Sequence, residues 1–314
     1  MRRALVASGA ETVERAKPLE VQRAPETPPH LENATPLEGS RVEVRSALGE
    51  PTVGFAAFLD GVQRSEVAAH RGLVPLVAGS IAAAVRVRAS RRLKTWNAPI
   101  VRHAIFAPVS MLEPAYVEAL AARCVVIDTS RDDGPTAGAL PRHPAEWAAR
   151  ALTAVQRARE DAEQSLARDW LREGQGPLLV DGGISADASV AVSAQTVGVV
   201  KSHRTLYVDG DSFALTLGLR AGERTTAVAI ASPRRTRVAS FYLRLRDPAS
   251  RGPFWGLVRV EIAADGPVGL TERADLASRW LLAERTPVAL PDARWDVMVY
   301  GIRDCEEYLS SILT

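Results

Sequence analysis

A short apolar run ends in an aspartate and two glycines at residues 176–185, which read GPLLVDGGIS. Apolar residues bounded by Gly-Pro and Gly-Gly predict a short buried strand that ends at Asp181. The stretch just before it, 144–172, predicts a long helix, because Pro144 suits a first helical turn and large apolar residues recur at helical spacing. These residues are Trp147, Leu152, Val155, Ala158, Ala162, Leu166 and Trp170. A long helix that leads into a buried strand favours an α/β fold.

Further strand-like stretches lie on both sides of this pair. They are VGFAAFLDG (53–61), LVPLVAGSIAAAVRVR (73–88), APIVRHAIFAPV (98–109), RCVVIDTS (123–130), VGVVKSHRTLYV (197–208), RTTAVAIAS (224–232), RVASFYLRL (237–245) and FWGLVRVEIA (254–263). Closing helices are expected at 270–284 and 300–313. The order predicts a mixed α/β domain over 51–314. Residues 1–50 carry five prolines among many charges, which predicts an extended N-terminal arm outside the core.

Composition limits the class of protein. A formal charge of +2 means that attraction to nucleic acid must come from local patches of charge. Cys124 and Cys305 have no partner at zinc-site spacing, and their scarcity favours a reducing cytoplasm. The longest charge-free apolar run, 72–85, is 14 residues long and is interrupted by proline and glycine. It is too short to span a membrane, and the N-terminus lacks the apolar segment of a signal peptide.

Two apolar strands end in the same way, FLDG at Asp60 and LVDG at Asp181. An aspartate at the carboxyl end of a strand lies at the rim of the sheet, where α/β proteins place their sites. Two such carboxylates without nearby histidine or cysteine suit Mn²⁺ or Mg²⁺ better than zinc. Asp-Gly is also a strong turn signal, so ordinary turn aspartates are the alternative.

A third carboxylate is expected from the long helix. Glu163 shares a stripe with Leu166 and Trp170 and borders the buried face, whereas Glu160 falls farther round and is held in reserve. The alternative is that both are solvated and pair with nearby arginines.

Several basic residues are candidates for phosphate contact. Lys201 follows the apolar run VGVV, in a chain whose only other lysines are Lys17 and Lys94. A compact point charge at a strand end suits a site beside a scissile phosphate, although an ordinary strand-end lysine fits as well. Two further basic groups are candidates for gripping a DNA backbone, or are solvated sheet edges. Their members are Arg91, Arg92 and Lys94 in the first and Arg234 and Arg235 in the second.

The order of these motifs resembles the NurA family of DNA nucleases over residues 50–314. The resemblance is carried by FLDG, the helical segment REDAE (159–163), LLVDGGIS, VGVVKS, SFYLRL (240–245), VRVEI (258–262) and RWDVMVYGIRDCEEYLSSIL (294–313). It implies an RNase H-like fold, Mn²⁺-dependent exonuclease and endonuclease activity, a homodimer, and partnership with a hexameric HerA-type ATPase in DNA end resection, repair or antiphage defence. It also implies metal ligation by Asp60, Glu163 and Asp181, phosphate contact by Lys201, and a catalytic role for Tyr300.

The chain departs from the family pattern at its end. Gly301 stands where the family commonly has proline after the tyrosine, and Tyr308 stands where archaeal members have a histidine. Glu306 is a candidate replacement for that histidine.

The expected chemistry is hydrolysis of a DNA phosphodiester. Asp60 and Asp181 would share divalent ions that activate a water and stabilise the leaving oxygen, with Glu163 completing the ligand shell. Two other classes remain open. An actin-like or sugar-kinase-like phosphotransferase would bind ATP with Mg²⁺, and a non-catalytic assembly subunit would bind DNA without cleaving it.

Overall fold

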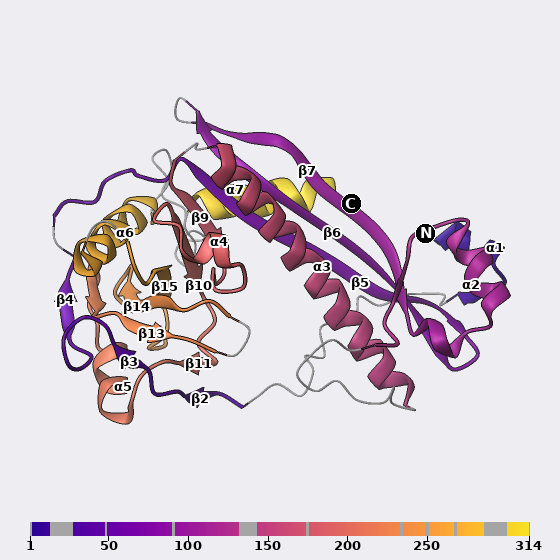
Figure 1. The fold of residues 1–314 in the computed structure, drawn as a ribbon, viewed down its shortest axis with the longest axis horizontal. Helices are drawn as coiled ribbons and strands as arrows, with labels where there is room; N and C mark the ends of the chain where they lie inside the picture. Colours follow the sequence, from indigo (N-terminus) through magenta and orange to yellow (C-terminus); the bar gives the residue numbers. More distant parts are fainter. Residues whose placement is uncertain are drawn as a thin grey trace.

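One mixed sheet contains thirteen of the strands in the described part of the chain (Figure 1). The computed structural model describes residues 2–12, 28–47, 49–89, 92–131, 143–173, 176–232, 235–248, 251–266, 269–285 and 300–313. The strands are β1 (Glu11–Thr12), β2 (His30–Leu31), β3 (Thr35–Pro36), β4 (Val44–Ser46), β5 (Ala57–Arg71), β6 (Val74–Ala89), β7 (Arg92–Ala107), β8 (Val126–Asp128), β9 (Leu178–Asp181), β10 (Thr196–Val200), β11 (Thr205–Leu206), β12 (Glu223–Thr225), β13 (Val228–Ile230), β14 (Val238–Arg244) and β15 (Leu257–Ala263). The helices are α1 (Arg2–Ala7), α2 (Pro114–Ala121), α3 (Pro144–Glu173), α4 (Ala188–Ala191), α5 (Gly210–Leu217), α6 (Leu270–Glu284) and α7 (Tyr300–Ile312), with a 3-10 turn at Val109–Met111.

The main path through the sheet is β3-β13-β14-β15-β10-β9-β5-β6-β7-β8. The long strands β5, β6 and β7 form an antiparallel meander. Short strands β9 and β10 continue from β5 in parallel, and β15 and β14 follow in antiparallel order. The sheet is therefore mixed, with its parallel part at the centre.

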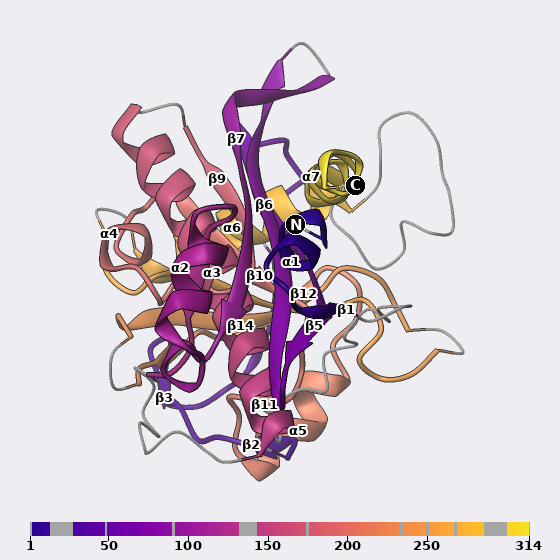
Figure 2. The same ribbon diagram turned by 90° about the vertical axis from the view of Figure 1, so that its right-hand side faces the viewer.

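Helices cover both faces of the long strands, with α2 and α3 on one side and α7 on the other (Figure 2). Leu59 and Val180 pack in one buried cluster with Trp170 of α3. Their strand neighbours Phe58 and Leu179 pack in another, with side chains of α6 and α7. This alternation is the two-residue period of a strand buried on both faces. None of the described helices combines the length and apolarity needed to cross a membrane.

Most of the predicted elements are present. The long helix is α3, both closing helices are α6 and α7, and the stretch 73–88 is β6. The stretch 197–208 divides into β10 and β11, which belong to different sheets, and 224–232 divides into β12 and β13. Helices α2 and α5 were not predicted, since each has only eight residues and little periodic pattern to read.

The prediction that a strand ends in a turn at Asp60 is wrong. Strand β5 runs for 15 residues and passes straight through Asp60 and Gly61. Both residues pair with β6, Asp60 opposite Ala84 and Gly61 opposite Ala83. Pairing along the whole length of β6 outweighs the local turn preference of Asp-Gly, because strand propensity depends strongly on tertiary context. What ends beside Asp60 is the neighbouring strand β9.

The prediction that the first 50 residues lie outside the core is wrong for the part that the structure describes. Leu5 and Val42 are buried, and β1, β3 and β4 pair with strands of the main sheet. Glu38 is buried and accepts two hydrogen bonds from Arg224, at 2.8 and 2.9 Å. The short strands were not recognised because proline-rich segments carry little period-two pattern.

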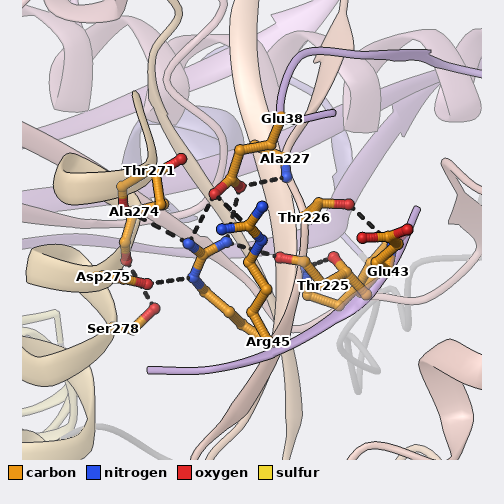
Figure 3. A network of polar contacts seen from close by, with 12 residues as sticks. Glu38, Glu43, Arg45, Thr225, Thr226, Ala227, Thr271, Ala274, Asp275 and Ser278 are labelled. Carbon is orange, nitrogen blue, oxygen red and sulfur yellow. Dashed lines mark hydrogen bonds and ion pairs between the residues drawn. The ribbon is translucent and has the colours of Figure 1, made fainter. Parts of the chain in front are cut away.

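A buried polar network joins Glu38, Thr225 and Asp275, which come from three parts of the chain (Figure 3). These three residues are linked through Arg224. Its side chain is fully buried and contacts Glu38 and, through Nε at 2.7 Å, Asp275 of α6. Glu38 also accepts from the backbone N–H of Ala227 at 2.8 Å. Burial by itself raises the pKa of Glu38, but the charge and hydrogen bonds of Arg224 more than offset this and lower it. The N-terminal stretch is thereby fixed to β12 and α6.

Candidate metal centre

Asp60 and Asp181 occupy matching positions on neighbouring parallel strands. Leu59 pairs with Val180, so the next residue along each strand is an aspartate. Asp181 is the last residue of β9 and also pairs with Val199 of β10. Lys201 follows the end of β10 directly, as predicted, and its Nζ donates to Oδ2 of Asp181 at 2.9 Å. Three of the predicted site residues thus meet where β9 and β10 end.

Glu163 reaches this region from α3, which packs on β5 and β6. It is buried, as the stripe on the helix predicted. Its carboxylate lies directly over Gly61, where a Cβ would collide with Oε1 of Glu163. Gly61 is therefore required for close approach of the helix side chain, which explains the glycine after Asp60 better than a turn does.

Burial and crowding of negative charge dominate the electrostatics of Asp60. Desolvation raises its pKa most, and the charges of Asp181 and Glu163 raise it further. The N–H of Gly61 donates to its Oδ1 at 2.7 Å, and Lys201 also lowers the pKa, but the net result is a pKa of about 8. The charges of three other predicted site residues, Asp181, Glu163 and Lys201, therefore lie close enough to Asp60 to change its pKa.

The pKa of Glu163 is raised in the same way. Burial raises it most, and the charge and hydrogen bond of Arg159 lower it. The charges of Glu160 and Asp181 raise it again, so that the pKa of Glu163 is about 7. Arg159 contacts Oε1 of Glu163 and donates to Gln63 of β5 at 3.1 Å. The alternative that Glu163 is solvated and pairs with a nearby arginine holds only for the pairing, because Glu163 is buried and Arg159 is half-buried. Two carboxyl groups with pKa values of about 7 and 8 need further positive charge to remain ionised near neutral pH.

A cavity of about 150 Å³ opens beside these carboxylates. Its walls include Glu163 and Asp181, the reserve candidate Glu160, and Arg235 from the predicted basic group. Arg235 donates to Ser185 Oγ at 3.3 Å, which places a cation in the cavity wall beside the loop that follows Asp181. Asp60 is 6% exposed and is not among the lining residues of this cavity. The alternation along β5 turns its side chain to the face of the sheet that α7 covers, where its cross-strand partner Ala84 packs with Leu309, whereas Leu59 and Gly61 face α3.

The loop after Asp181 is hydrogen-bonded to Glu261, a residue that the sequence motifs did not single out. Gly182 has a φ of +127°, which favours glycine, and the chain turns there. Glu261 of β15 is 2% exposed, and its Oε2 accepts from the backbone N–H of Ile184 at 2.8 Å. A Cβ at Gly183 would lie 2.9 Å from the same oxygen. A charged residue inside the apolar strand VRVEI was the available signal for Glu261.

The donor set fits a hard divalent cation by chemistry, because carboxylate oxygens are the ligands that Mn²⁺ and Mg²⁺ prefer. The arrangement is not a finished ligand set. Among the residues that the structure describes, no three His, Cys, Asp or Glu side chains are already grouped as metal ligands. Lys201 is paired with Asp181, and Arg159 with Glu163. A cation at this centre would have to take the place of these side-chain charges on at least one carboxylate.

The remaining predicted residues lie elsewhere or outside the described part. Tyr300 is the half-buried first residue of α7 and does not line the cavity. Glu306 is exposed on the same helix. Tyr308 packs under Arg86, whose Cζ lies 4.7 Å from the centroid of the tyrosine ring. The exposed Arg92 and Lys94 begin β7, at the projecting end of its hairpin with β6 (Figure 2). Arg91 and Arg234 fall outside the described residues.

No protein-family model matches the chain, and a search of the curated proteins finds no match. The geometry of the centre is accordingly the basis on which its chemistry is inferred.

Proposed function

We propose that this chain is a metal-dependent DNA nuclease of the NurA type. The observation that carries the proposal is the approach of Glu163, Asp181 and Lys201 to Asp60 from separate segments of the chain, with Lys201 in contact with Asp181 and all three charges acting on the pKa of Asp60. Two of the carboxyl groups are left undercompensated by the protein, as expected of a site that takes up a cation. A basic residue on either side, Lys201 and Arg235, suits a polyanionic substrate.

Each residue has a defined task in phosphodiester hydrolysis. Asp60, Asp181 and Glu163 would hold Mn²⁺ or Mg²⁺, which when bound supplies a water of lowered pKa and neutralises charge on the phosphate. Lys201 would bind a non-bridging phosphate oxygen, since its Nζ already lies beside Asp181. Glu261 and Gly183 would position the loop that carries Asp181, and Arg235 would orient the DNA backbone across the cavity.

An RNase H-like core is part of the proposal. It is supported by the strand order β7-β6-β5-β9-β10, in which the first three strands are antiparallel and the last two run parallel to β5. A homodimer and a hexameric HerA-type ATPase partner are proposed with it, on the sequence resemblance. Light scattering on the protein alone, and on a mixture with such an ATPase, tests both.

Cleavage of end-labelled DNA in Mn²⁺, with and without EDTA, tests the activity. Asp181→Asn should abolish cleavage while leaving the fold intact, because the amide keeps the shape of the side chain and removes the charge that holds a cation. Asp161→Asn is the matched control, since Asp161 is an exposed carboxylate on the same helix as Glu163. Equal cleavage by Asp181→Asn and the wild type at saturating Mn²⁺ would refute the proposed role of Asp181.

Metal binding has a readout that does not depend on activity. A ligand that binds only the folded state stabilises it by about 2.7 kcal/mol when present at 100 times its dissociation constant. Mn²⁺ should therefore raise the melting temperature of the wild type, leave that of Asp60→Asn nearly unchanged, and raise that of Asp161→Asn as in the wild type. The same shift in Asp60→Asn would place the cation elsewhere.

One observation favours a second candidate, a non-catalytic DNA-binding subunit. Lys201 and Arg159 already pair with two of the three carboxylates, as expected if the fold has kept the site and lost the metal. Such a protein binds DNA equally well in EDTA and in Mn²⁺ and cleaves in neither.

A further inference from the structure

A second cavity, of about 340 Å³, lies beside the Lys201–Asp181 pair. Lys201 lines it together with His203, Phe254 and Trp255. Asp181 lines the smaller cavity beside the carboxylates, and the 2.9 Å contact between Lys201 and Asp181 connects the two spaces. Its volume falls in the range of small-molecule sites, about 300–1,000 Å³.

The walls of this cavity are aromatic. The rings of His203 and Phe254 are stacked, with centroids 5.0 Å apart and planes inclined by 19°. Phe254 is 38% exposed, which leaves part of a large ring open to solvent at the mouth of the cavity. Trp255, next along the chain, has Arg251 over its ring at 4.6 Å. Flat, partly exposed rings beside a cation are the features with which proteins bind unpaired bases.

Two buried ring nitrogens on these walls lack partners among the described residues. The Nε2 of His203 lies 3.0 Å from the carbonyl of Leu257, which can only accept, so Nε2 is the donor and Nδ1 the acceptor in the neutral ring. This Nδ1 and the Nε1 of Trp255 have no hydrogen-bond partner within the described part of the protein. Buried polar atoms are nearly always paired, and both of these unpaired nitrogens belong to side chains that line the cavity.

We propose that this cavity is a nucleobase subsite, in which an unpaired base stacks on Phe254 while its phosphate lies at Lys201. The inference rests on the proposed nuclease function and extends it to substrate choice. A base in duplex DNA is stacked and paired, and it has to leave the helix before it can enter such a cavity. The chain should therefore act on single-stranded segments or frayed ends in preference to blunt duplex.

Binding measured in EDTA tests the subsite without any cleavage. Fluorescence anisotropy would compare a labelled oligothymidylate of about 12 nucleotides, an abasic strand of the same length and a blunt duplex. The wild type should bind the thymidylate strand about fivefold or more tightly than the abasic strand, which is the lower end of the stacking contribution of one base.

Three variants locate the effect. Phe254→Leu keeps an apolar side chain of similar size and should lose the preference for the base-bearing strand, whereas Phe254→Trp should keep it. Phe213→Leu should also keep it. Phe213 lines a neighbouring cavity that His203 and Phe254 line as well but Lys201 does not, so loss of the preference in this variant would place the base there and overturn the subsite at Lys201. Circular dichroism and melting temperature establish that each variant is folded.

The possible results are distinct. Equal binding of thymidylate and abasic strands by the wild type, or an unchanged preference in Phe254→Leu, overturns the subsite. A base preference that depends on Phe254, in a protein that cleaves nothing in Mn²⁺, overturns the nuclease proposal and supports the subsite. Absence of any DNA binding overturns both.

Discussion

The molecule contains two buried clusters of charged side chains that differ in their balance. Around Arg224, one guanidinium lies between Glu38 and Asp275 at 2.7–2.8 Å, and the pKa of Glu38 is lowered despite its burial. Around Asp60, three carboxylates share the charges of Lys201 and Arg159, and the pKa of Asp60 is raised to about 8. The first cluster satisfies its charges internally, and the second leaves Asp60 and Glu163 with raised pKa values.

This difference separates a structural role from a functional one. A buried charge that is fully paired fixes the segments that carry it and has no capacity left for a ligand. A buried carboxyl that the fold leaves underpaired costs stability, and such groups gather at functional sites. Substitutions in each cluster test this difference.

Deleting residues 1–45 should have the largest effect, because it removes Glu38 together with three strands of the sheet. Arg224 would then be buried beside Asp275 alone. We expect the truncated chain to be largely unfolded at 25 °C, as judged by circular dichroism and protease sensitivity. A folded, monodisperse truncation would mean that the N-terminal stretch is only a detachable arm.

Arg224→Leu should destabilise the protein by about 3–5 kcal/mol, since it removes the guanidinium that lies between the two buried carboxylates of Glu38 and Asp275. Urea unfolding measures this change. Arg41→Ala is the matched control, because Arg41 pairs with Glu43 at an exposed position and should contribute no more than about 1 kcal/mol. Similar losses in the two variants would contradict the structural role assigned to Arg224.

Asp60→Asn should change the pH dependence of stability in metal-free protein. The folded pKa of about 8 lies above the ordinary value of 3.8, so the folded state binds more protons than the unfolded state between these values. Stability is then highest below pH 4 for this group and falls by a few kcal/mol as pH rises to about 8. Urea unfolding at pH 5, 7 and 9 should show this decline in the wild type and a smaller one in Asp60→Asn. Parallel curves would mean that Asp60 is not the group responsible.

Gly61→Ala should have the smallest effect on stability, no more than about 1 kcal/mol, because the atom that it meets is the end of the Glu163 side chain. Displacing that carboxylate should nevertheless weaken Mn²⁺ binding by about tenfold, in the range found when groups that support metal ligands are removed. Isothermal titration with Mn²⁺ measures this. Gly210→Ala, at a position with open space, should leave the affinity unchanged.

Much of the architecture was available from sequence patterns. Strong helical periodicity identified α3 and placed Glu163 on its buried face, and apolar runs located β6, β9, β10 and β14. The strand-end position of Lys201 was also predictable, because VGVV is a compact apolar run. These features depend on local sequence, which is what periodicity reports.

Features decided by distant partners were not predictable in the same way. Asp60 lies within a strand because β6 pairs across it, and no signal near Asp60 reveals that pairing. Glu38 is buried because Arg224, 186 residues away, needs a counter-charge. The pairs Lys201–Asp181 and Arg159–Glu163 likewise follow from packing, and only the second, at helical spacing, had a local signature.

The parallel pairing of β5 with β9 has a consequence for how this protein folds. These strands are separated by more than 100 residues of chain, including the antiparallel meander and α3. Contacts between such distant segments form late and slowly, because a long loop must be closed before they can contribute. The helix and the meander can form from local contacts, but the two aspartates meet only once β9 has docked. During refolding, affinity for a divalent cation should therefore return after most of the helical circular dichroism signal. The time at which this affinity returns would show when β9 docks.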